Sequence, residues 1–169
     1  MSELKKTERI LGIDPGFGRV GIGIIEKRNN EWVHVAHGLI ETNSKKKFVE
    51  RIEEIHDKLE FVLKKYQPTR AAVEELFFAK NVTTGIQVAQ ARGAILLSLT
   101  QAHIPIDEFT PMEVKQAITG YGRADKTQMQ KMVIMLLSLK VKKLQDDAAD
   151  ALGIALCCSA GLSFRLKMK

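Results

Sequence analysis

The chain has 169 residues, 45% of them hydrophobic and 27% charged, which is typical of one globular domain with its own core. No run approaches the roughly 18 apolar residues of a membrane-spanning helix, and the polar start of the chain lacks the apolar segment of a signal peptide. The formal net charge of +6 favours a polyanionic partner such as nucleic acid. The adjacent Cys157 and Cys158 are too few for a disulfide framework, so buried thiols in a reducing cytoplasm are expected.

The first pattern along the chain is a short apolar run that stops at an acid. Residues 10–13 form the run, and Asp14 is followed at once by the turn-forming Pro15 and Gly16. A second apolar run covers residues 20–25, so two strands joined by a tight turn are expected. Asp14 then ends a central strand, where an acid either makes an Asx turn or belongs to a functional site.

The next segments predict a third strand and a crossover helix. Residues 32–40 are rich in strand-forming side chains and follow the turn-forming Asn29 and Asn30, so an antiparallel meander is expected. Between residues 44 and 66 apolar side chains recur every three or four positions, which indicates an amphipathic helix with Ser44 as its N-cap. Pro68 ends this helix.

A strand that contains acids follows at residues 70–78. Because it comes after a crossover helix, it is expected to pair in parallel with the first strand and to bring its acids to the edge where Asp14 lies. Side chains alternate along a strand, so Glu74 and Glu75 face opposite ways. Phe77, beyond the acids, is either part of the core or a surface on which bases stack.

The following segments predict two further helices and a short strand. Residues 82–100 form a helix whose small side chains allow close packing, either within the chain or against a second copy; one side of it carries Ile86, Ala89, Gln90, Gly93, Ala94, Leu97 and Thr100. A strand at residues 104–109 leads into a helix that begins at Pro111 and ends near Thr119.

Two more helices complete the chain. After a glycine-containing loop, Asp125 caps a helix whose expected apolar face is Met129, Met132, Val133, Leu136 and Leu137. The last helix starts near Asp146, and its Asp147 and Asp150 share one helical face among small apolar residues. A carboxylate at Asp150, one turn into an apolar helix, needs a cation or a hydrogen-bond donor nearby.

These elements can bring four acids together, namely Asp14, Glu74, Asp147 and Asp150. Carboxylates at close range repel, and some stay protonated unless a cation lies between them. Oxygen ligands without histidine or cysteine suit Mg²⁺ or Mn²⁺ better than zinc. A two-metal carboxylate site can hydrolyse phosphodiesters, and a basic chain around it can hold phosphates.

The sequence resembles the RuvC family of bacterial Holliday-junction resolvases. The residues that carry the resemblance stand in the family's order over about residues 8–160; they are 12–16, 73–74, 78–81, 90–93, 114–116 and 147–152. The resemblance implies an α/β, ribonuclease-H-like fold with a five-stranded mixed sheet flanked by helices. It places a disordered extension at residues 1–7, the nuclease domain at 8–162 and a basic tail at 163–169.

The resemblance also implies an activity. It describes a cytoplasmic homodimer that resolves four-way DNA junctions symmetrically in recombination and repair, leaves 5′-phosphate and 3′-hydroxyl ends, and works with the RuvA–RuvB branch-migration complex. Two Mg²⁺ ions per site, which Mn²⁺ replaces, would be held by the catalytic acids Asp14, Glu74, Asp147 and Asp150. DNA would be contacted by Phe77, Lys80, Lys115, Arg123 and Lys126.

Other functions share some of these features. The turn after Asp14 also opens actin-like ATPases and sugar kinases, but those need a second domain and a second phosphate loop, for which 169 residues are too few. A nuclease of the same fold that acts on another substrate, such as an RNA–DNA hybrid, stays open, as does a non-catalytic junction-binding protein. Cleavage of a four-way junction distinguishes them.

Overall fold

The computed structural model describes residues 7–76 and 82–167, and a five-stranded sheet with the order β3-β2-β1-β4-β5 lies at its centre. The strands are β1 (Arg9–Asp14), β2 (Arg19–Arg28), β3 (Glu31–Glu41), β4 (Arg70–Glu74) and β5 (Ile106–Phe109). The first three form an antiparallel meander, whereas β4 pairs in parallel with both β1 and β5. The mixed sheet and its expected meander are therefore confirmed.

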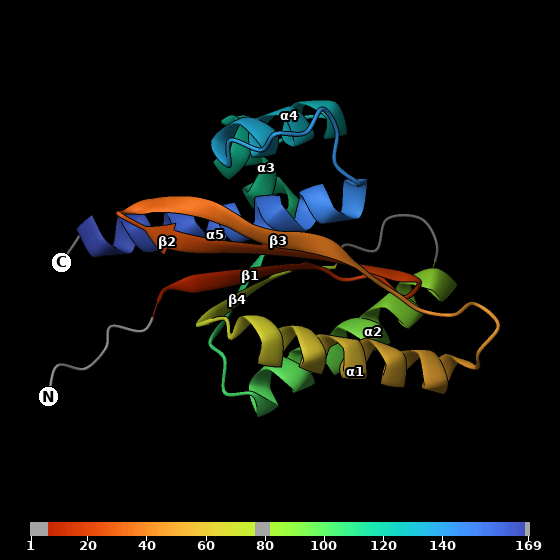
Figure 1. Ribbon diagram of the computed structural model, residues 1–169. Coiled ribbons are helices and arrows are strands. Elements are labelled where there is room, and N and C mark those ends of the chain that lie inside the picture. The colour runs from red at the N-terminus through yellow and green to blue at the C-terminus, as the bar shows by residue number, and fades with distance from the viewer. Residues whose placement is uncertain (1–6, 77–81, 168–169) are drawn as a thin grey trace, which may run out of the picture.

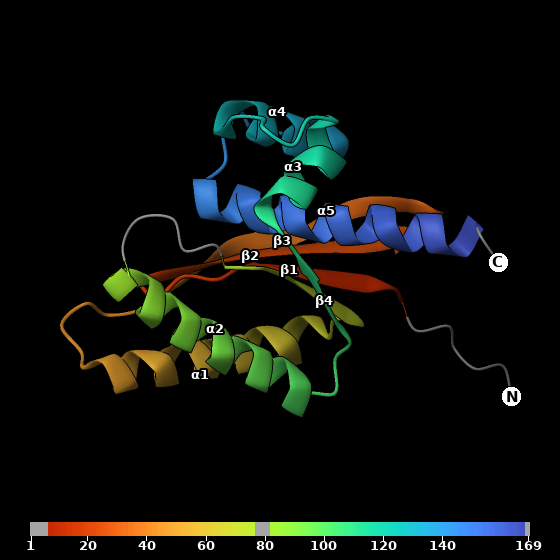
Figure 2. The same ribbon diagram turned by 180° about the vertical axis from the view of Figure 1, so that it is seen from behind.

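Helices cover both faces of this sheet. They are α1 (Phe48–Tyr66), α2 (Val82–Gln101), α3 (Pro111–Thr119), α4 (Lys126–Leu136) and α5 (Asp146–Lys167). Figure 1 shows α1 and α2 on one face and α5 on the other, with α3 and α4 beyond α5; Figure 2 shows the same layers from behind. Alternation along β1 supplies both cores, because Leu11 and Ile13 pack with α1 and α2 while Ile10 packs with α5.

The local sequence explains where several elements begin and end. Asn29 and Asn30 have φ values of 49° and 66°, a conformation that asparagine tolerates, and they form the tight turn between β2 and β3. Ser44, however, is not the N-cap of α1. The helix begins three residues later than expected, because the Glu50 carboxylate accepts a hydrogen bond from the backbone N–H of Lys47 at 2.7 Å and makes Lys47 the cap.

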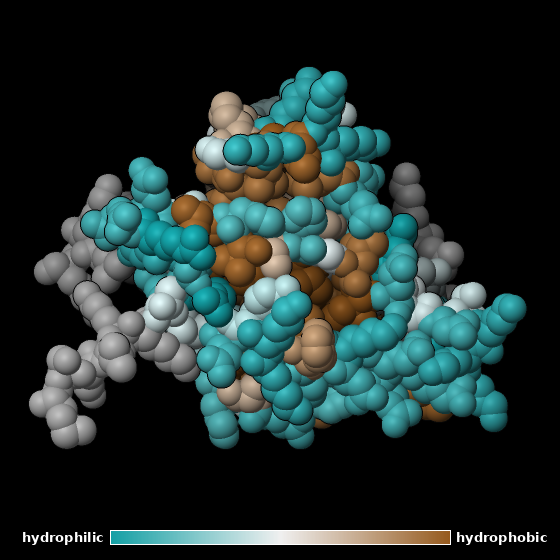
Figure 3. Space-filling view, in the orientation of Figure 1, coloured by the Kyte–Doolittle hydropathy of each residue, from teal (hydrophilic) through white to brown (hydrophobic). Residues whose placement is uncertain are grey.

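The helix α4 confirms its predicted cap and corrects its predicted apolar face. Asp125 accepts a hydrogen bond from the backbone N–H of Gln128 at 2.8 Å. Met129, Val133 and Leu137 are buried, but Leu136 is 47% exposed because the buried stripe follows the four-residue spacing of those three. Figure 3 shows apolar surface around α4, in contrast to the hydrophilic surface over α1.

The helix α5 lies unusually close to the sheet. A side chain at Gly12 would overlap the carbonyl oxygen of Ala151, and one at Gly21 would overlap the carbonyl oxygen of Asp147. Glycine at these two positions thus allows the helix backbone to contact β1 and β2 directly. Among the described residues, no helix is long and apolar enough to cross a membrane.

Candidate active site

The ends of β1 and β4 bring two acids to one edge of the sheet. Ile13 of β1 pairs with Val73 of β4, so Asp14 and Glu74 follow side by side at the carboxyl ends of parallel strands. Asp14 is also the antiparallel partner of Gly21 in β2. The expectation that Asp14 and Glu74 share an edge is therefore confirmed.

The start of α5 brings the other two acids to the same edge. Because Gly21 has no side chain, the Asp147 backbone lies directly over it, next to its strand partner Asp14. Figure 1 shows this first turn of α5 above the end of β1. Asp150 is three residues further on and lies on the same helical face as Asp147. We refer to Asp14, Glu74, Asp147 and Asp150 together as the acidic edge.

Burial and the neighbouring carboxylates raise the pKa values of three of these acids. Burial first, and then the charges of Asp150 and Asp147, raise the pKa of Asp14 to about 7. Burial, followed by the charges of Asp14 and Asp150, raises the pKa of Glu74 to about 7. The pKa of Asp150 is also raised, chiefly by burial. The acidic edge therefore holds more carboxylate than its surroundings neutralise, which favours a functional site over a simple turn.

The structure distinguishes the acids at this edge from their neighbours in sequence. Asp14 and Asp150 act on the pKa of Glu74, whereas Glu75 is not among the charges that chiefly act on Asp14, Glu74 or Asp150. The side chain of Asp147 is 26% exposed, whereas that of Asp146 is 53% exposed. These differences favour Glu74 over Glu75, and Asp147 over Asp146, as members of the site.

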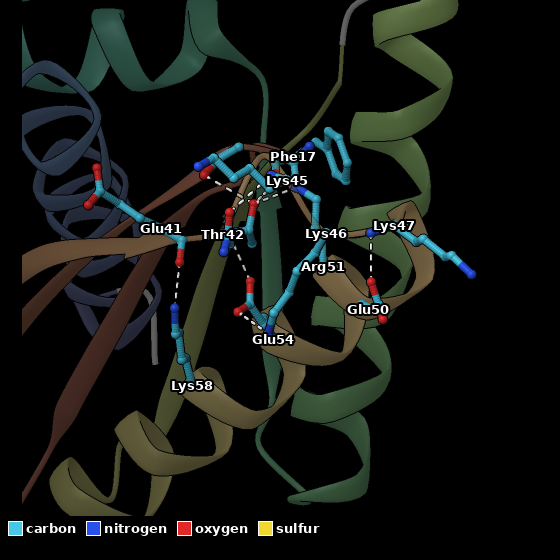
Figure 4. Close-up of polar contacts among 12 residues, drawn as sticks. Phe17, Glu41, Thr42, Lys45, Lys46, Lys47, Glu50, Arg51, Glu54 and Lys58 are labelled. Carbon is cyan, nitrogen blue, oxygen red and sulfur yellow. Dashed lines mark hydrogen bonds and ion pairs between the residues drawn. The ribbon is translucent and has the colours of Figure 1, made fainter.

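A polar network holds the turn that follows Asp14 (Figure 4). The hydroxyl of Thr42 donates to the carbonyl of Phe17 at 3.0 Å, and the Nε of Arg51 donates to the same hydroxyl at 2.9 Å. The Arg51 guanidinium also lies over the Phe17 ring, 3.6 Å from its centroid. The end of β3 and the start of α1 therefore fix the turn, and with it the direction in which Asp14 leaves the strand.

Two of the predicted DNA-binding lysines face the acidic edge. Lys126 lowers the pKa of Asp14, Glu74 and Asp150, and Lys115 lowers the pKa of Glu74 and Asp150. The predicted Arg123 is exposed and lies instead beside an apolar groove of about 590 Å³ lined by Met112 and Tyr121. The remaining predicted contacts, Phe77 and Lys80, lie outside the described residues.

One cation at the site was not singled out from the sequence. The Nε of Arg19, at the start of β2, lies 3.2 Å from a carboxylate oxygen of Asp147. Its position two residues before Gly21, the strand partner of Asp14, was the available signal. That signal could be used only once the register between β1 and β2 was known.

The donor set of the acidic edge consists of carboxylates, which suits a hard divalent cation. As they stand, however, no three of the histidine, cysteine, aspartate and glutamate side chains within residues 7–76 and 82–167 are arranged so that they could hold one metal ion. The edge therefore fits an ion that takes one or two protein carboxylates and completes its shell with water and phosphate, as Mg²⁺ usually does.

Comparisons with known proteins agree with this geometry. The family model for crossover junction endodeoxyribonuclease RuvC matches residues 10–158. The RuvC of Thermosipho melanesiensis is 47% identical over 156 residues, which cover 92% of this chain and 99% of that protein. The RuvC of Halothermothrix orenii is 49% identical over 160 residues, which cover 95% and 96%.

Solved structures give the same result. Thermus thermophilus RuvC in complex with Holliday junction substrate has a TM-score of 0.86 and 32% identity to this chain, and the match covers 94% of this chain and 96% of that one. The sheet order, the helices on both faces and the converged acids define an α/β nuclease. More narrowly, the chain belongs to the RuvC family of crossover junction endodeoxyribonucleases. The resemblance found in the sequence is confirmed.

Proposed function

We propose that this protein resolves four-way DNA junctions by metal-dependent hydrolysis at the acidic edge. The observation that carries the proposal is the convergence of Asp14, Glu74, Asp147 and Asp150 beside Lys115 and Lys126, in a chain of the RuvC family. The acids supply ligands and the lysines supply positive charge for a phosphate. A merely structural cluster has no reason to gather carboxylates whose pKa values are raised to about 7.

The cation that best suits the edge is Mg²⁺, with Mn²⁺ as a replacement. Asp14 and Glu74 would be ligands because they end adjacent strands, and Asp147 and Asp150 would complete the set from α5. Two bound ions would activate a water molecule and offset the charge that develops on the departing oxygen. The four carboxylates can then all be ionised at neutral pH, because the positive charge removes their mutual repulsion.

The chain's own groups orient the reaction. Lys115 and Lys126 are placed to bind the non-bridging oxygens of the phosphate, since both already lie near Glu74 and Asp150. The oxygen of water attacks phosphorus and gives up one proton to solvent, the bond from phosphorus to the 3′ oxygen breaks, and the 3′ oxygen takes one proton from solvent. The products are a 5′-phosphate and a 3′-hydroxyl, ends that a ligase can rejoin.

Symmetric cutting of a junction requires two sites, so we place a second copy of the chain against α2. This helix buries Ala91, Ile95 and Leu99 but leaves Ile86 and Leu97 exposed by 53% and 58%. On the same side, a side chain at Gly93 would meet nothing within 4 Å. An exposed stripe with small and apolar members is suited to a two-fold contact between identical helices. Cooperation with the RuvA–RuvB complex rests on family membership alone.

The decisive experiment compares three substrates: a synthetic four-way junction, a linear duplex of the same sequence and an RNA–DNA hybrid. With Mg²⁺, the junction is expected to be cut at paired positions in opposite strands, and chelation is expected to stop the reaction. The Asp14→Asn variant is expected to bind the junction without cutting it. Preferred cutting of the hybrid would indicate another nuclease, and binding without cutting by the wild type would indicate a non-catalytic protein.

The dimer has its own test. We expect Leu97→Asp to shift the protein from dimer to monomer in sedimentation velocity, because it places a charge in the apolar stripe of α2. The matched control is Met135→Asp on α4, since Met135 is exposed by 62%, much like Leu97, but lies away from α2. Equal masses for the two variants and the wild type would exclude this stripe as the interface.

A further inference from the structure

A hollow of about 490 Å³ opens beside the acidic edge. It lies between the start of β2, the strand β3 and the loop that enters α5, with Asp147 in its wall. In the sheet order it is on the β2–β3 side of Asp14, whereas Lys115 acts on Glu74, which is on the β4 side. The hollow is therefore next to the reacting centre but on the side away from Lys115.

Three cations line the hollow, Arg19, Lys126 and Lys143, together with two carboxylates, Asp146 and Asp147. Arg19 contacts Asp147 through Nε, and Lys126 lies 3.9 Å from Asp146. Among residues 7–76 and 82–167, Arg19 forms an ion pair with Asp147 alone, and no carboxylate lies within ion-pair distance of Lys143. A guanidinium can bind a carboxylate with one edge and a phosphate with another, so Arg19 can serve both.

The wall of the hollow is mixed. Leu39 of β3 and Leu144, which is only 4% exposed, lie in it beside Gln145 and the carboxylates of Asp146 and Asp147. Arg19 and Lys143 have exposed side chains. Cations close to an apolar side chain such as Leu39 match a nucleotide unit, whose phosphate is charged and whose sugar and base present apolar surface.

We propose that this hollow holds one nucleotide of the cleaved strand beside the cut, with its phosphodiester on Arg19 and Lys143 and its sugar against Leu39. Arg19 then contacts both this phosphate and Asp147, so that the position of the DNA strand is coupled to the position of an acid in α5. The inference rests on the proposed function, because it assumes that the acidic edge cuts DNA. It adds residues that neither the sequence motifs nor the family's acids identify.

The test measures junction binding in an Asp14→Asn background, where the DNA stays intact. Arg19→Ala and Lys143→Ala are each expected to weaken binding about 8-fold in about 0.1 M salt, the value of one released counterion, and to lower the salt slope by about one. Lys64→Ala is the matched control, because Lys64 is an exposed lysine of α1 that pairs with Glu60. It is expected to change neither quantity.

A scan with neutral methylphosphonate linkages locates the phosphate. One linkage near the cut is expected to weaken binding of the Asp14→Asn protein but to cause no further loss in the Asp14→Asn/Arg19→Ala protein. Additive losses at every linkage, with both variants folded as the wild type is, would overturn the hollow as a phosphate site. If the Asp14→Asn protein instead fails to prefer the junction over a linear duplex, the proposed function fails and not this inference alone.

Discussion

The buried acid near one end of β1 is paired with cations, whereas the acid at the other end faces further acids. At its start, Glu26 is only 5% exposed, yet Arg9 and Arg28 bind its carboxylate, and hydrogen bonds from Arg28 and Arg9 lower its pKa. At its end, Asp14 faces other carboxylates, and its pKa is raised to about 7. The six residues of β1 thus connect a cluster in which the acid is paired with arginines (the matched end) to a cluster in which carboxylates outweigh the nearby cations (the unmatched end).

This difference shows which buried acids serve the fold and which serve chemistry. A carboxylate that serves the fold comes with its own cations, because an uncompensated buried charge is costly. At the acidic edge Arg19, Lys115 and Lys126 offset only part of the carboxylate charge, which leaves room for ions that are not part of the protein. The close carboxylates at the unmatched end therefore lower the free energy of unfolding, which is expected where residues serve function rather than stability.

The largest expected effect is at the unmatched end. Glu74→Gln should reduce junction cleavage by more than about 100-fold, which exceeds the usual loss when only a supporting residue is removed. The matched control is Glu75→Gln, because this neighbouring glutamate lies outside the acidic edge. Single-turnover cleavage rates measure both variants. Equal loss in the two would mean that Glu74 has no special role.

The next effect is expected at the matched end. Glu26→Gln should lower the free energy of unfolding by about 2 kcal/mol, because it weakens the charged hydrogen bonds that Arg9 and Arg28 make with this carboxylate. Urea titration at pH 7 measures this loss, and cleavage per folded molecule should stay unchanged. Glu31→Gln, at the exposed start of β3, provides the control and should leave stability as it is.

The lysines at the acidic edge should affect rate more than stability. Lys126→Ala and Lys115→Ala are each expected to slow cleavage about tenfold or more, since each removes positive charge from the phosphate-binding side of the site. Their melting temperatures should remain within about 2 °C of the wild type, because removing a cation near the acids breaks no buried ion pair. A large fall in melting temperature with an unchanged rate would make them structural residues.

The smallest effect concerns pH. The pKa values of Asp14 and Glu74 rise from 3.8 and 4.5 to about 7 on folding, so the folded state holds more protons than the unfolded state between these values. Their contribution to stability is therefore present in acid and is lost as pH rises towards about 7. For the metal-free protein, the Asp14→Asn/Glu74→Gln variant should gain stability relative to the wild type between pH 5 and pH 8, because it lacks the two carboxyl groups that lose their protons there.

The lowered pKa of Glu26 acts in the opposite direction, and its contribution is lost as pH falls. For that reason the test is the difference in stability between variant and wild type at each pH, rather than the pH dependence of either protein alone. Thermal unfolding in a chelator at both pH values provides it. Addition of Mg²⁺ at pH 8 should raise the melting temperature of the wild type more than that of the variant, because a ligand stabilises the state that binds it.

The sequence was informative where the order of the elements decides geometry. The strand that follows the crossover helix was expected to pair in parallel with the first strand, β1, so the shared edge of Asp14 and Glu74 could be predicted from the order of the elements. The sequence was less informative where side chains compete locally. Ser44 and Lys47 both precede α1, and only the reach of Glu50 decides between them. Likewise Leu136 falls within the periodic pattern of α4 but outside its buried stripe.

The hollow beside the site could not be foreseen in the same way. Arg19, Leu39 and Lys143 are far apart in sequence and carry no common motif, and they meet only because of the register of β2 with β3 and the path of the loop into α5. Residues that belong to one motif can be identified from a single sequence, whereas residues that only become neighbours on folding can be identified only from the structure.

The contact of α5 with Gly12 and Gly21 has a consequence for heat inactivation. Because main chain rests on main chain there, no flexible side chain separates the Asp14 half of the site from the Asp147 half. The acidic edge is therefore expected to keep its geometry until α5 separates from the sheet. As temperature rises, cleavage activity should persist until the whole chain unfolds, so that the loss of activity and the loss of helical signal fall on one curve.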